Sequence, residues 1–173
     1  MHLSAGDLLR KEQTTAGSQF GQLIADHIKN GTIVPVEITC SLLENAMLEH
    51  MISLASPVSG DDPIPIGNFL IDGFPRNQNN LEGWQKQVAD KVNIKFILFF
   101  ECPREDCINR CLERGKDSGR ADDNPESMAK RLDTYLNQTM PIVEHYEKMG
   151  IVRRIDASRP ISQVFDDVRQ LFS

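Results

Sequence analysis

An aspartate and an arginine follow an apolar segment in Phe69-Leu-Ile-Asp-Gly-Phe-Pro-Arg76. The pattern predicts a buried strand over residues 69–72 that carries Asp72 at its carboxyl end, followed by a tight glycine turn. Open α/β sheets bind ligands at that edge. Pro75 fixes its own backbone and restricts the residue before it, so Arg76 should have a defined direction. A planar guanidinium in this place suits a phosphate group, although an ordinary strand followed by a surface arginine has the same pattern.

Other arginines also stand at the ends of expected elements or at loop borders. Together with Arg76 they are Arg10, Arg114, Arg120 and Arg131. Five guanidinium groups in such places fit a site for several phosphates. The alternative is that each is a solvated surface arginine with a local acidic partner, a pair that contributes little to stability.

Strands and helices are expected to alternate along the chain. Apolar segments predict strands over 69–72, 95–101 and 151–155. Five consecutive apolar residues in the second strand indicate burial on both faces. Periodicity predicts a helix after Pro35 and further helices over 18–30, 78–88, 103–114, 125–149 and 161–172. The alternation predicts an α/β fold with a doubly wound parallel sheet and helices on both faces.

Glycine and proline punctuate this pattern. Gly115 should end the helix over 103–114, and Pro141 should kink the helix over 125–149. Residues 56–67 hold three prolines and two glycines, which predicts a loop. In the last helix Phe165 and Phe172 are among the residues expected to face inward.

The composition indicates a soluble globular protein with one domain over residues 1–173. A net charge of -6 does not favour a nucleic-acid partner. The longest apolar run, 96–100, is too short to cross a bilayer, and the start of the chain carries no secretory signal. The cytoplasm is therefore the expected location, with the nucleus as a second one. Buried reduced thiols, rather than a metal site, are expected for Cys40, Cys102, Cys107 and Cys111.

Five ordered motifs cover nearly the whole chain: His2-Leu-Ser-Ala-Gly-Asp-Leu-Leu-Arg10, Gly31-Thr-Ile-Val-Pro35, Leu70-Ile-Asp-Gly-Phe-Pro-Arg-Asn77, Arg114-Gly-Lys-Asp-Ser-Gly-Arg-Ala-Asp-Asp-Asn124 and Arg153-Arg-Ile-Asp-Ala-Ser158. With these motifs the chain resembles the nucleoside monophosphate kinases of the adenylate kinase family, and among them the UMP–CMP kinases. The resemblance implies a fold of the P-loop kinase type, with a monophosphate-binding part over about 1–67 and a lid over about 115–124. It implies transfer of the γ-phosphoryl group of ATP to CMP, UMP or dCMP in pyrimidine nucleotide metabolism.

The resemblance also implies which residues bind the monophosphate. Its phosphate is held by Arg10 and by the turn of Gly73, Phe74, Pro75 and Arg76. Its base lies against the backbone of Thr32, Ile33 and Val34. When the lid closes, Arg120 and Arg131 reach the same substrate.

Phosphoryl transfer is assigned in the same way. Arg114, Arg120 and Arg131 are implied to surround the transferring group, where a cationic clamp stabilises the charge of the transition state. Arg114 and Arg159 are implied to contact ATP, and Asp72 to order waters around Mg²⁺. The implied partners are small-molecule nucleotides, and a monomer is expected.

Two positions bear on the choice of base. Asn80, four residues after Arg76, stands where the similar adenylate kinases usually carry glutamine, and Ala5 stands where they tend to carry threonine. A short amide offers a donor and an acceptor that suit the Watson–Crick edge of a pyrimidine. Asn80 could instead be a plain surface residue of a helix.

The sequence departs from the family at two places. The family opens with a strand and a Gly-x-x-x-x-Gly-Lys-Ser/Thr phosphate loop, whereas Gly115-Lys116 is the only Gly-Lys pair of these 173 residues and is followed by Asp117. The first strand and the P-loop are thus expected to be missing. A kinase represented by a shortened chain, a catalytically impaired nucleotide-binding or regulatory fragment, and a structural fragment remain open as interpretations. The segment 56–67 is also longer than the family usually has there.

Overall fold

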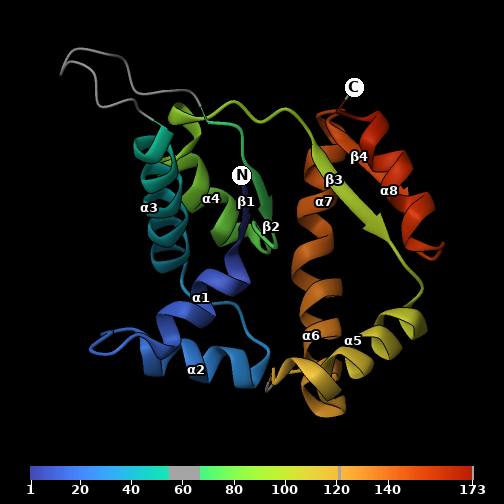
Figure 1. The fold of residues 1–173 in the computed structure, drawn as a ribbon, viewed down its shortest axis with the longest axis horizontal. Helices are drawn as coiled ribbons and strands as arrows, with labels where there is room; N and C mark the ends of the chain where they lie inside the picture. Colours follow the sequence, from blue (N-terminus) through green and yellow to red (C-terminus); the bar gives the residue numbers. More distant parts are fainter. Residues whose placement is uncertain (55–66, 121, 173) are drawn as a thin grey trace. The chain divides into compact units, whose positions relative to one another are not determined.

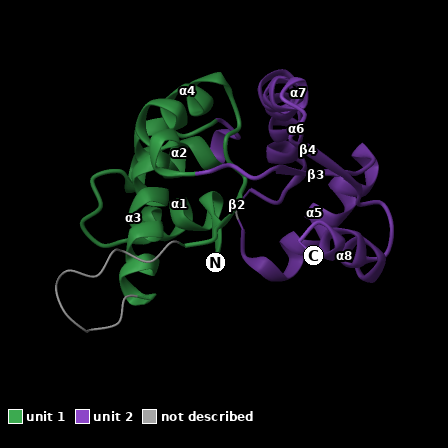
Figure 2. Ribbon diagram, turned by 90° about the horizontal axis from the view of Figure 1, so that it is seen from above, with its two compact units in different colours: residues 1–28, 33–92 green, residues 29–32, 93–173 purple. Residues whose placement is uncertain are grey.

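The computed structural model describes residues 1–54, 67–120 and 122–172 (Figure 1). Helices and strands alternate along it, and both strand pairs are parallel. The α/β class with parallel strands, predicted from the sequence, is therefore confirmed. The chain divides into two compact units, unit 1 with residues 1–28 and 33–92 and unit 2 with residues 29–32 and 93–173 (Figure 2). The single domain expected from the chain length is not tested by this division and stays a prediction.

Unit 1 is built around two short parallel strands. Its elements are β1 (His2–Ser4), α1 (Ala5–Thr14), most of α2 (Gly21–Asn30), α3 (Val36–Leu54), β2 (Leu70–Asp72), α4 (Gln78–Gln87) and the 3₁₀ turn η1 (Ala89–Lys91). In the pairing of β1 with β2, Ser4 lies opposite Asp72. Both strands therefore end at the same edge, from which α1 and the Gly73 turn depart.

The core of unit 1 lies where α3 and α4 pack together beside β1 (Figure 1). Its buried side chains are Leu3, Leu43, Met47, Trp84 and Val88. A second buried cluster joins Ile24 of α2 to Val34 and Ile38. The helix α1 begins directly after β1 because the Ser4 side chain accepts a hydrogen bond from the Asp7 backbone N–H, which is the usual role of an N-cap serine.

Unit 2 carries a second parallel pair with a longer register. Its elements are β3 (Ile97–Glu101), α5 (Arg104–Ser118), α6 (Pro125–Thr134), the π-helical turn η2 (Tyr135–Thr139), α7 (Met140–Lys148), β4 (Val152–Asp156) and α8 (Ile161–Gln170). The five residues of β3 pair with the five of β4. In the described residues the parallel strands thus form two separate two-stranded sheets.

The burial predicted for the strands is wrong. No residue of β3 is buried and Phe100 is 49% exposed, while Leu70 of β2 is 47% exposed. Within the described residues each strand pairs along one edge only, and so small a sheet leaves much of its surface in contact with water. Phe165 and Phe172, expected to face inward, are also exposed. An apolar run in the sequence therefore located these segments, but it did not show how much of their surface the rest of the protein buries.

The predicted end of one helix is wrong. The helix α5 continues through Gly115 to Ser118 and ends at Gly119, whose φ of 64° lies in the left-handed region that favours glycine. Residues 115–118 of the expected lid are therefore helical. Pro141 lies in the first turn of α7, directly after the π turn, and the kink predicted at this proline stays a prediction.

Other predictions from the sequence had different outcomes. The strand β1 was not predicted from the sequence. It has three residues, of which only Leu3 is buried, and so short a segment shows no alternation of apolar and polar residues. The helices α2, α4 and α6 begin or end within a few residues of the predicted positions. The loop predicted over residues 56–67 lies, apart from Gly67, outside the described residues.

Candidate active site

Arg10 lies on α1, soon after β1 ends. Its Nη2 donates a hydrogen bond to Asp7 Oδ1 at 2.5 Å. A Cβ on Gly6 would lie 3.1 Å from the same Nη2, so the glycine leaves the space that the guanidinium occupies. Local contacts therefore hold the Arg10 side chain against the first turn of its own helix, near the edge where β1 and β2 end.

Arg76 closes the turn that follows β2. Its Nε donates to the Gly73 carbonyl oxygen at 2.7 Å. Gly73 has a φ of 74°, and a Cβ there would lie 3.0 Å from Arg76 Nη2. Glycine is thus required both by the backbone conformation and by the arginine that folds back over it. The Arg76 guanidinium has the defined direction that the sequence predicted.

Asn80 is a buried residue, 2% exposed, and not the plain surface residue considered as an alternative. Its Oδ1 accepts a hydrogen bond from the Arg76 backbone N–H at 3.2 Å, and its own backbone N–H donates to Asn77 Oδ1 at 2.8 Å. Asn77 is the N-cap of α4. The Asn80 side chain therefore ties α4 to the Gly73–Arg76 turn through its carbonyl oxygen.

Asp72 ends β2 next to Ser4 and is exposed. Mg²⁺ prefers oxygen ligands and is usually held by one or two carboxylates, waters and substrate phosphates. A single exposed carboxylate at the end of a strand fits that limited role. Among the described residues no group of three or more His, Cys, Asp or Glu side chains could by itself hold a metal ion.

In unit 2, Arg114 forms a two-pronged ion pair with Asp123. Arg114 Nε and Nη2 each donate to one oxygen of that carboxylate, both at 2.7 Å. The Asp123 side chain is 0% exposed. A Cβ on Gly115 would lie 2.5 Å from the Asp123 carbonyl oxygen, so the glycine inside α5 permits this close approach.

Arg131 of α6 reaches the same acidic pair. Its Nη1 donates to Asp122 Oδ2 at 3.0 Å and to Asp123 Oδ1 at 3.3 Å. The hydrogen bonds from Arg114 lower the pKa of Asp123 most; burial opposes them, and the charges of Arg114, Arg131 and Arg120 add to the lowering. Arg114 and Arg131 therefore bind the same buried carboxylate, and the charge of Arg120 also acts on it.

This ion-pair cluster should make stability depend on pH. Because the folded-state pKa of Asp123 is lowered, its contribution is present above the ordinary aspartate pKa of about 3.9 and is lost as pH falls through the lower folded value. We expect Asp123→Asn to reduce the free energy of unfolding at pH 7 by about 1–2 kcal/mol. The expected loss is below that for a fully buried pair because Arg114 and Arg131 are 41% and 31% exposed.

The measurement is denaturant unfolding of wild type and Asp123→Asn between pH 7 and pH 3. The difference between them should shrink toward the acid end. Asp166→Asn, which removes one side of an exposed pair with Arg169, serves as the control and should have little effect. A difference that is constant over this pH range would refute the role of the carboxylate charge.

Arg159 lies in the turn after β4. Its guanidinium pairs with Asp167 and its Nε donates to the Asp156 carbonyl oxygen at 3.3 Å. Arg110 of α5 donates from Nη1 to the Ala157 carbonyl oxygen at 2.7 Å and from Nη2 to that of Ser158 at 3.3 Å. Both arginines thus hold the backbone of this turn.

The segment expected to line the base runs from one unit into the other along the chain, with Thr32 in unit 2 and Ile33 and Val34 in unit 1. Val34 is buried with Ile24 and Ile38, while Thr32 is exposed. Unit 1 therefore holds Arg10, Asp72, Arg76 and Asn80 near one strand edge, and unit 2 holds Arg114, Arg120 and Arg131 around Asp123.

Asp122, Asp123 and Arg110 are residues that the sequence analysis did not assign. The two aspartates could have been found, since two adjacent acids beside Arg120 in a loop bordered by arginines are the expected counter-charges. Arg110 could not, because its carbonyl partners are 47 and 48 residues away.

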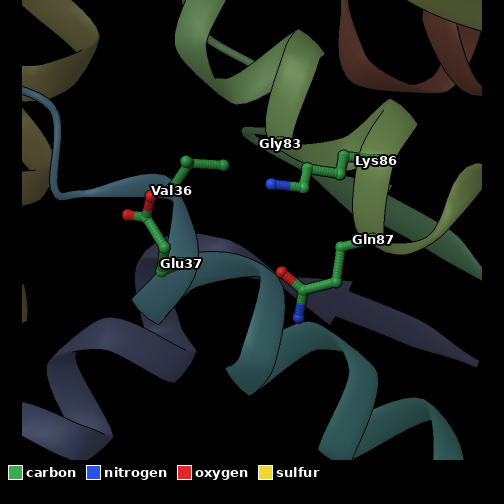
Figure 3. Close-up of a pocket in the computed structure, with 5 residues that line it drawn as sticks. All are labelled: Val36, Glu37, Gly83, Lys86 and Gln87. Carbon is green, nitrogen blue, oxygen red and sulfur yellow. The ribbon is translucent and has the colours of Figure 1, made fainter.

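A pocket of about 280 Å³ lies between the start of α3 and α4 in unit 1 (Figure 3). It is lined by Val36, Glu37, Gly83, Lys86 and Gln87. None of the sequence-predicted site residues lines it. Gly83 permits the close packing here, because a Cβ would lie 2.3 Å from Val36 Cγ2.

The thiols of Cys40 and Cys107 give no nucleophile to the site. Burial is the main cause that raises the pKa of Cys40 to about 11 and that of Cys107 to about 11. Both thiols are therefore protonated at neutral pH, the unreactive form.

None of the helices in the described ranges is long and apolar enough to cross a membrane.

Comparison with known proteins places this sequence in a family. The family model for adenylate kinase matches residues 1–151. The UMP-CMP kinase of Gallus gallus is 54% identical over 171 residues, which are 99% of this chain and 83% of that protein. The UMP-CMP kinase of Danio rerio is 55% identical over 170 residues, 98% of this chain and 82% of that protein, and that of Homo sapiens is 54% identical over 171 residues, 99% and 83%. The chain therefore belongs to the adenylate kinase family of nucleoside monophosphate kinases.

Proposed function

We propose that the protein transfers the γ-phosphoryl group of ATP to a pyrimidine nucleoside monophosphate, namely CMP, UMP or dCMP. The observation that carries the proposal is the identity of 53–55% with UMP-CMP kinases over 98–99% of the chain. The product of such a reaction is a pyrimidine nucleoside diphosphate. Since each chain carries both sets of proposed residues, a monomer is the acting form.

The monophosphate is proposed to bind to the residues of unit 1. Arg10 and Arg76 supply guanidinium donors near the edge where β1 and β2 end, and guanidinium forks pair well with phosphate oxygens. Bound phosphate would compete with the Asp7 and Gly73 oxygens that accept from these arginines in the structure. Asn80 supports the same site because its side chain fixes the Arg76 backbone.

Phosphoryl transfer is proposed to rely on Arg114, Arg120 and Arg131. The transition state spreads negative charge over the equatorial oxygens, so positioned cations stabilise it more than they stabilise the bound substrates. Asp123 holds Arg114 and Arg131 in place before the nucleotide arrives. Mg²⁺, when bound, neutralises charge on the phosphates, and Asp72 would hold it through water.

A second candidate is that residues 1–173 by themselves bind nucleotides but are impaired in catalysis. It is favoured by one observation, the lack of a Gly-x-x-x-x-Gly-Lys-Ser/Thr sequence within these 173 residues. That loop normally cradles the phosphates of ATP with backbone N–H groups and a lysine. Both candidates predict binding of CMP and UMP and differ in turnover.

Base selectivity tests the proposal through binding. We expect wild type to bind CMP and UMP more tightly than AMP in titration calorimetry. Asn80→Gln should lower the CMP-to-AMP preference by about tenfold, because the longer amide displaces the donor and disturbs the contact with Arg76. Equal or tighter binding of AMP by wild type would contradict the proposal.

The matched control is Asn79→Gln, the same change at the exposed neighbouring position of α4. It should leave the preference within about twofold of wild type. Loss of the preference in both variants would point to a general effect on the helix.

A further inference from the structure

The carbonyl group of Gly31 is held by a side chain from a distant part of unit 2. Thr134, the last residue of α6, has its Oγ1 3.1 Å from the Gly31 carbonyl oxygen, although the two residues are 103 positions apart. A carbonyl cannot donate, so the threonine hydroxyl is the donor. Threonine hydroxyls in helices often bond to a carbonyl of their own helix; this one bonds to another segment.

The backbone of Gly31 also packs closely on α6. A Cβ at this position would lie 3.1 Å from Lys130 Cβ and 3.4 Å from the Arg131 backbone nitrogen. Gly31 ends α2 with a φ of 65°, a conformation that glycine adopts without strain. A larger residue would thus be disfavoured twice, by its backbone and by the neighbouring helix.

The hydrogen bond fixes more than one atom. The carbonyl of Gly31 and the N–H of Thr32 belong to the same planar peptide and point in opposite directions. A bond from Thr134 to the carbonyl oxygen therefore sets the direction of the Thr32 N–H, away from α6. The backbone that continues from this peptide, residues 32–34, is the segment proposed to line the base.

We infer that Thr134 is a positioning residue for the monophosphate, which holds the Gly31–Thr32 peptide in its binding orientation from the helix that carries Arg131. This inference rests on the proposed function and adds a residue to it. Arg131 lies one turn before Thr134, and its backbone nitrogen and Cγ are among the atoms that a Cβ on Gly31 would meet, at 3.4 and 3.5 Å. One short stretch of α6 therefore supplies both a phosphoryl-transfer arginine and the anchor of the base-lining backbone.

The test compares Thr134→Val, which keeps the shape and removes the hydroxyl, with Thr134→Ser, which keeps the hydroxyl. CMP and ATP are titrated by calorimetry into the 173-residue chain shown to be folded by circular dichroism. We expect Thr134→Val to weaken CMP binding by about 3- to 10-fold, the range for a lost neutral hydrogen bond, and Thr134→Ser to stay within about twofold of wild type. ATP binding should change by less than about twofold in either variant.

The matched control is Thr15→Val, because the Thr15 hydroxyl bonds to the carbonyl oxygen of Lys11 in its own helix region. It should leave CMP binding within about twofold of wild type. If Thr134→Val does not fold, Thr134→Ala takes its place with the same expected loss. Hydrogen exchange supplies a second measurement that needs no ligand. The backbone amides of residues 29–34 should exchange faster in Thr134→Val, or in Thr134→Ala where it takes its place, than in wild type.

Three outcomes would overturn the inference. Unchanged CMP binding by Thr134→Val, with wild type binding CMP normally, would remove the positioning role and leave the proposed function intact. Equal weakening of CMP and ATP binding would indicate a structural effect alone. A wild-type chain that does not bind CMP would refute the proposed function and this inference together.

Discussion

Turnover of CMP should rise at least about 10²–10³-fold when residues 1–173 are preceded by a strand and a Gly-x-x-x-x-Gly-Lys-Ser/Thr segment taken from a relative. The added loop supplies backbone N–H donors and a lysine that position the phosphates of ATP. Removal of a single electrostatic group of this kind lowers the rate about 10²–10³-fold. Here the extended form has the whole set of such groups, and residues 1–173 alone have none of them.

Nothing in the described part of the chain replaces such a loop. The one Gly-Lys pair, Gly115-Lys116, lies inside α5, and Lys116 pairs at 2.6 Å with Glu113 on the same helix. Helical backbone N–H groups there are used within the helix, so they cannot surround a phosphate. The arginines of unit 2 can stabilise a transferring group, but they do not form a cradle of backbone donors.

The measurement is a coupled assay of ADP formation with CMP and ATP. The residues 1–173 alone, the extended form, and the extended form with the lysine of the added loop changed to methionine are compared. The last form is the matched control and should lose most of the gain. Turnover by residues 1–173 alone in the range of about 1–100 s⁻¹ typical of kinases would refute the expectation.

The sequence was sufficient for the elements whose signals are local. Pro35, for example, predicted where α3 begins, because its fixed backbone acts within the first helical turn. The glycine at position 115 was misread for the opposite reason. Its role is to admit the Asp123 backbone, eight residues later, and a contact of that kind has no local signature.

The candidate site shows the same limit. Arginine positions could be read from the motifs, and the structure holds Arg114 and Arg131 on the carboxylate of Asp123, so the shared phosphate site stays a prediction. Their carboxylate partner and the two carbonyls held by Arg110 depend on tertiary contacts. Asn80 also gained a role from packing, since its burial and its bond to Arg76 follow from how α4 meets the turn after β2.

Arg131→Met is expected to lower kcat for CMP phosphorylation by about 10²–10³-fold in the extended form of the chain. The methionine keeps much of the apolar stem and removes the charge. Because the proposed contact strengthens as charge develops on the transferring group, kcat should fall much more than the KM for CMP rises. Arg131→Lys restores a charge without the planar fork and should recover only part of the loss.

Steady-state kinetics with both substrates varied provides the measurement. The control is Arg169→Met, because Arg169 on α8 is exposed and pairs loosely with Asp166 at 3.7 Å. It should leave kcat within about threefold of wild type. A kcat for Arg131→Met that is also within about threefold of wild type would remove Arg131 from the transfer step.

Asp123 makes a sharper version of this experiment possible. Its carboxylate binds both Arg114 and Arg131, so its effect on catalysis should pass through these arginines. If so, Asp123→Asn should lower kcat less in the Arg131→Met background than in wild type, since one of the two side chains that it positions has already lost its charge. Equal losses in both backgrounds would mean that Asp123 acts independently of Arg131, and the carboxylate would then be assigned to the fold of unit 2 or to Arg114 alone.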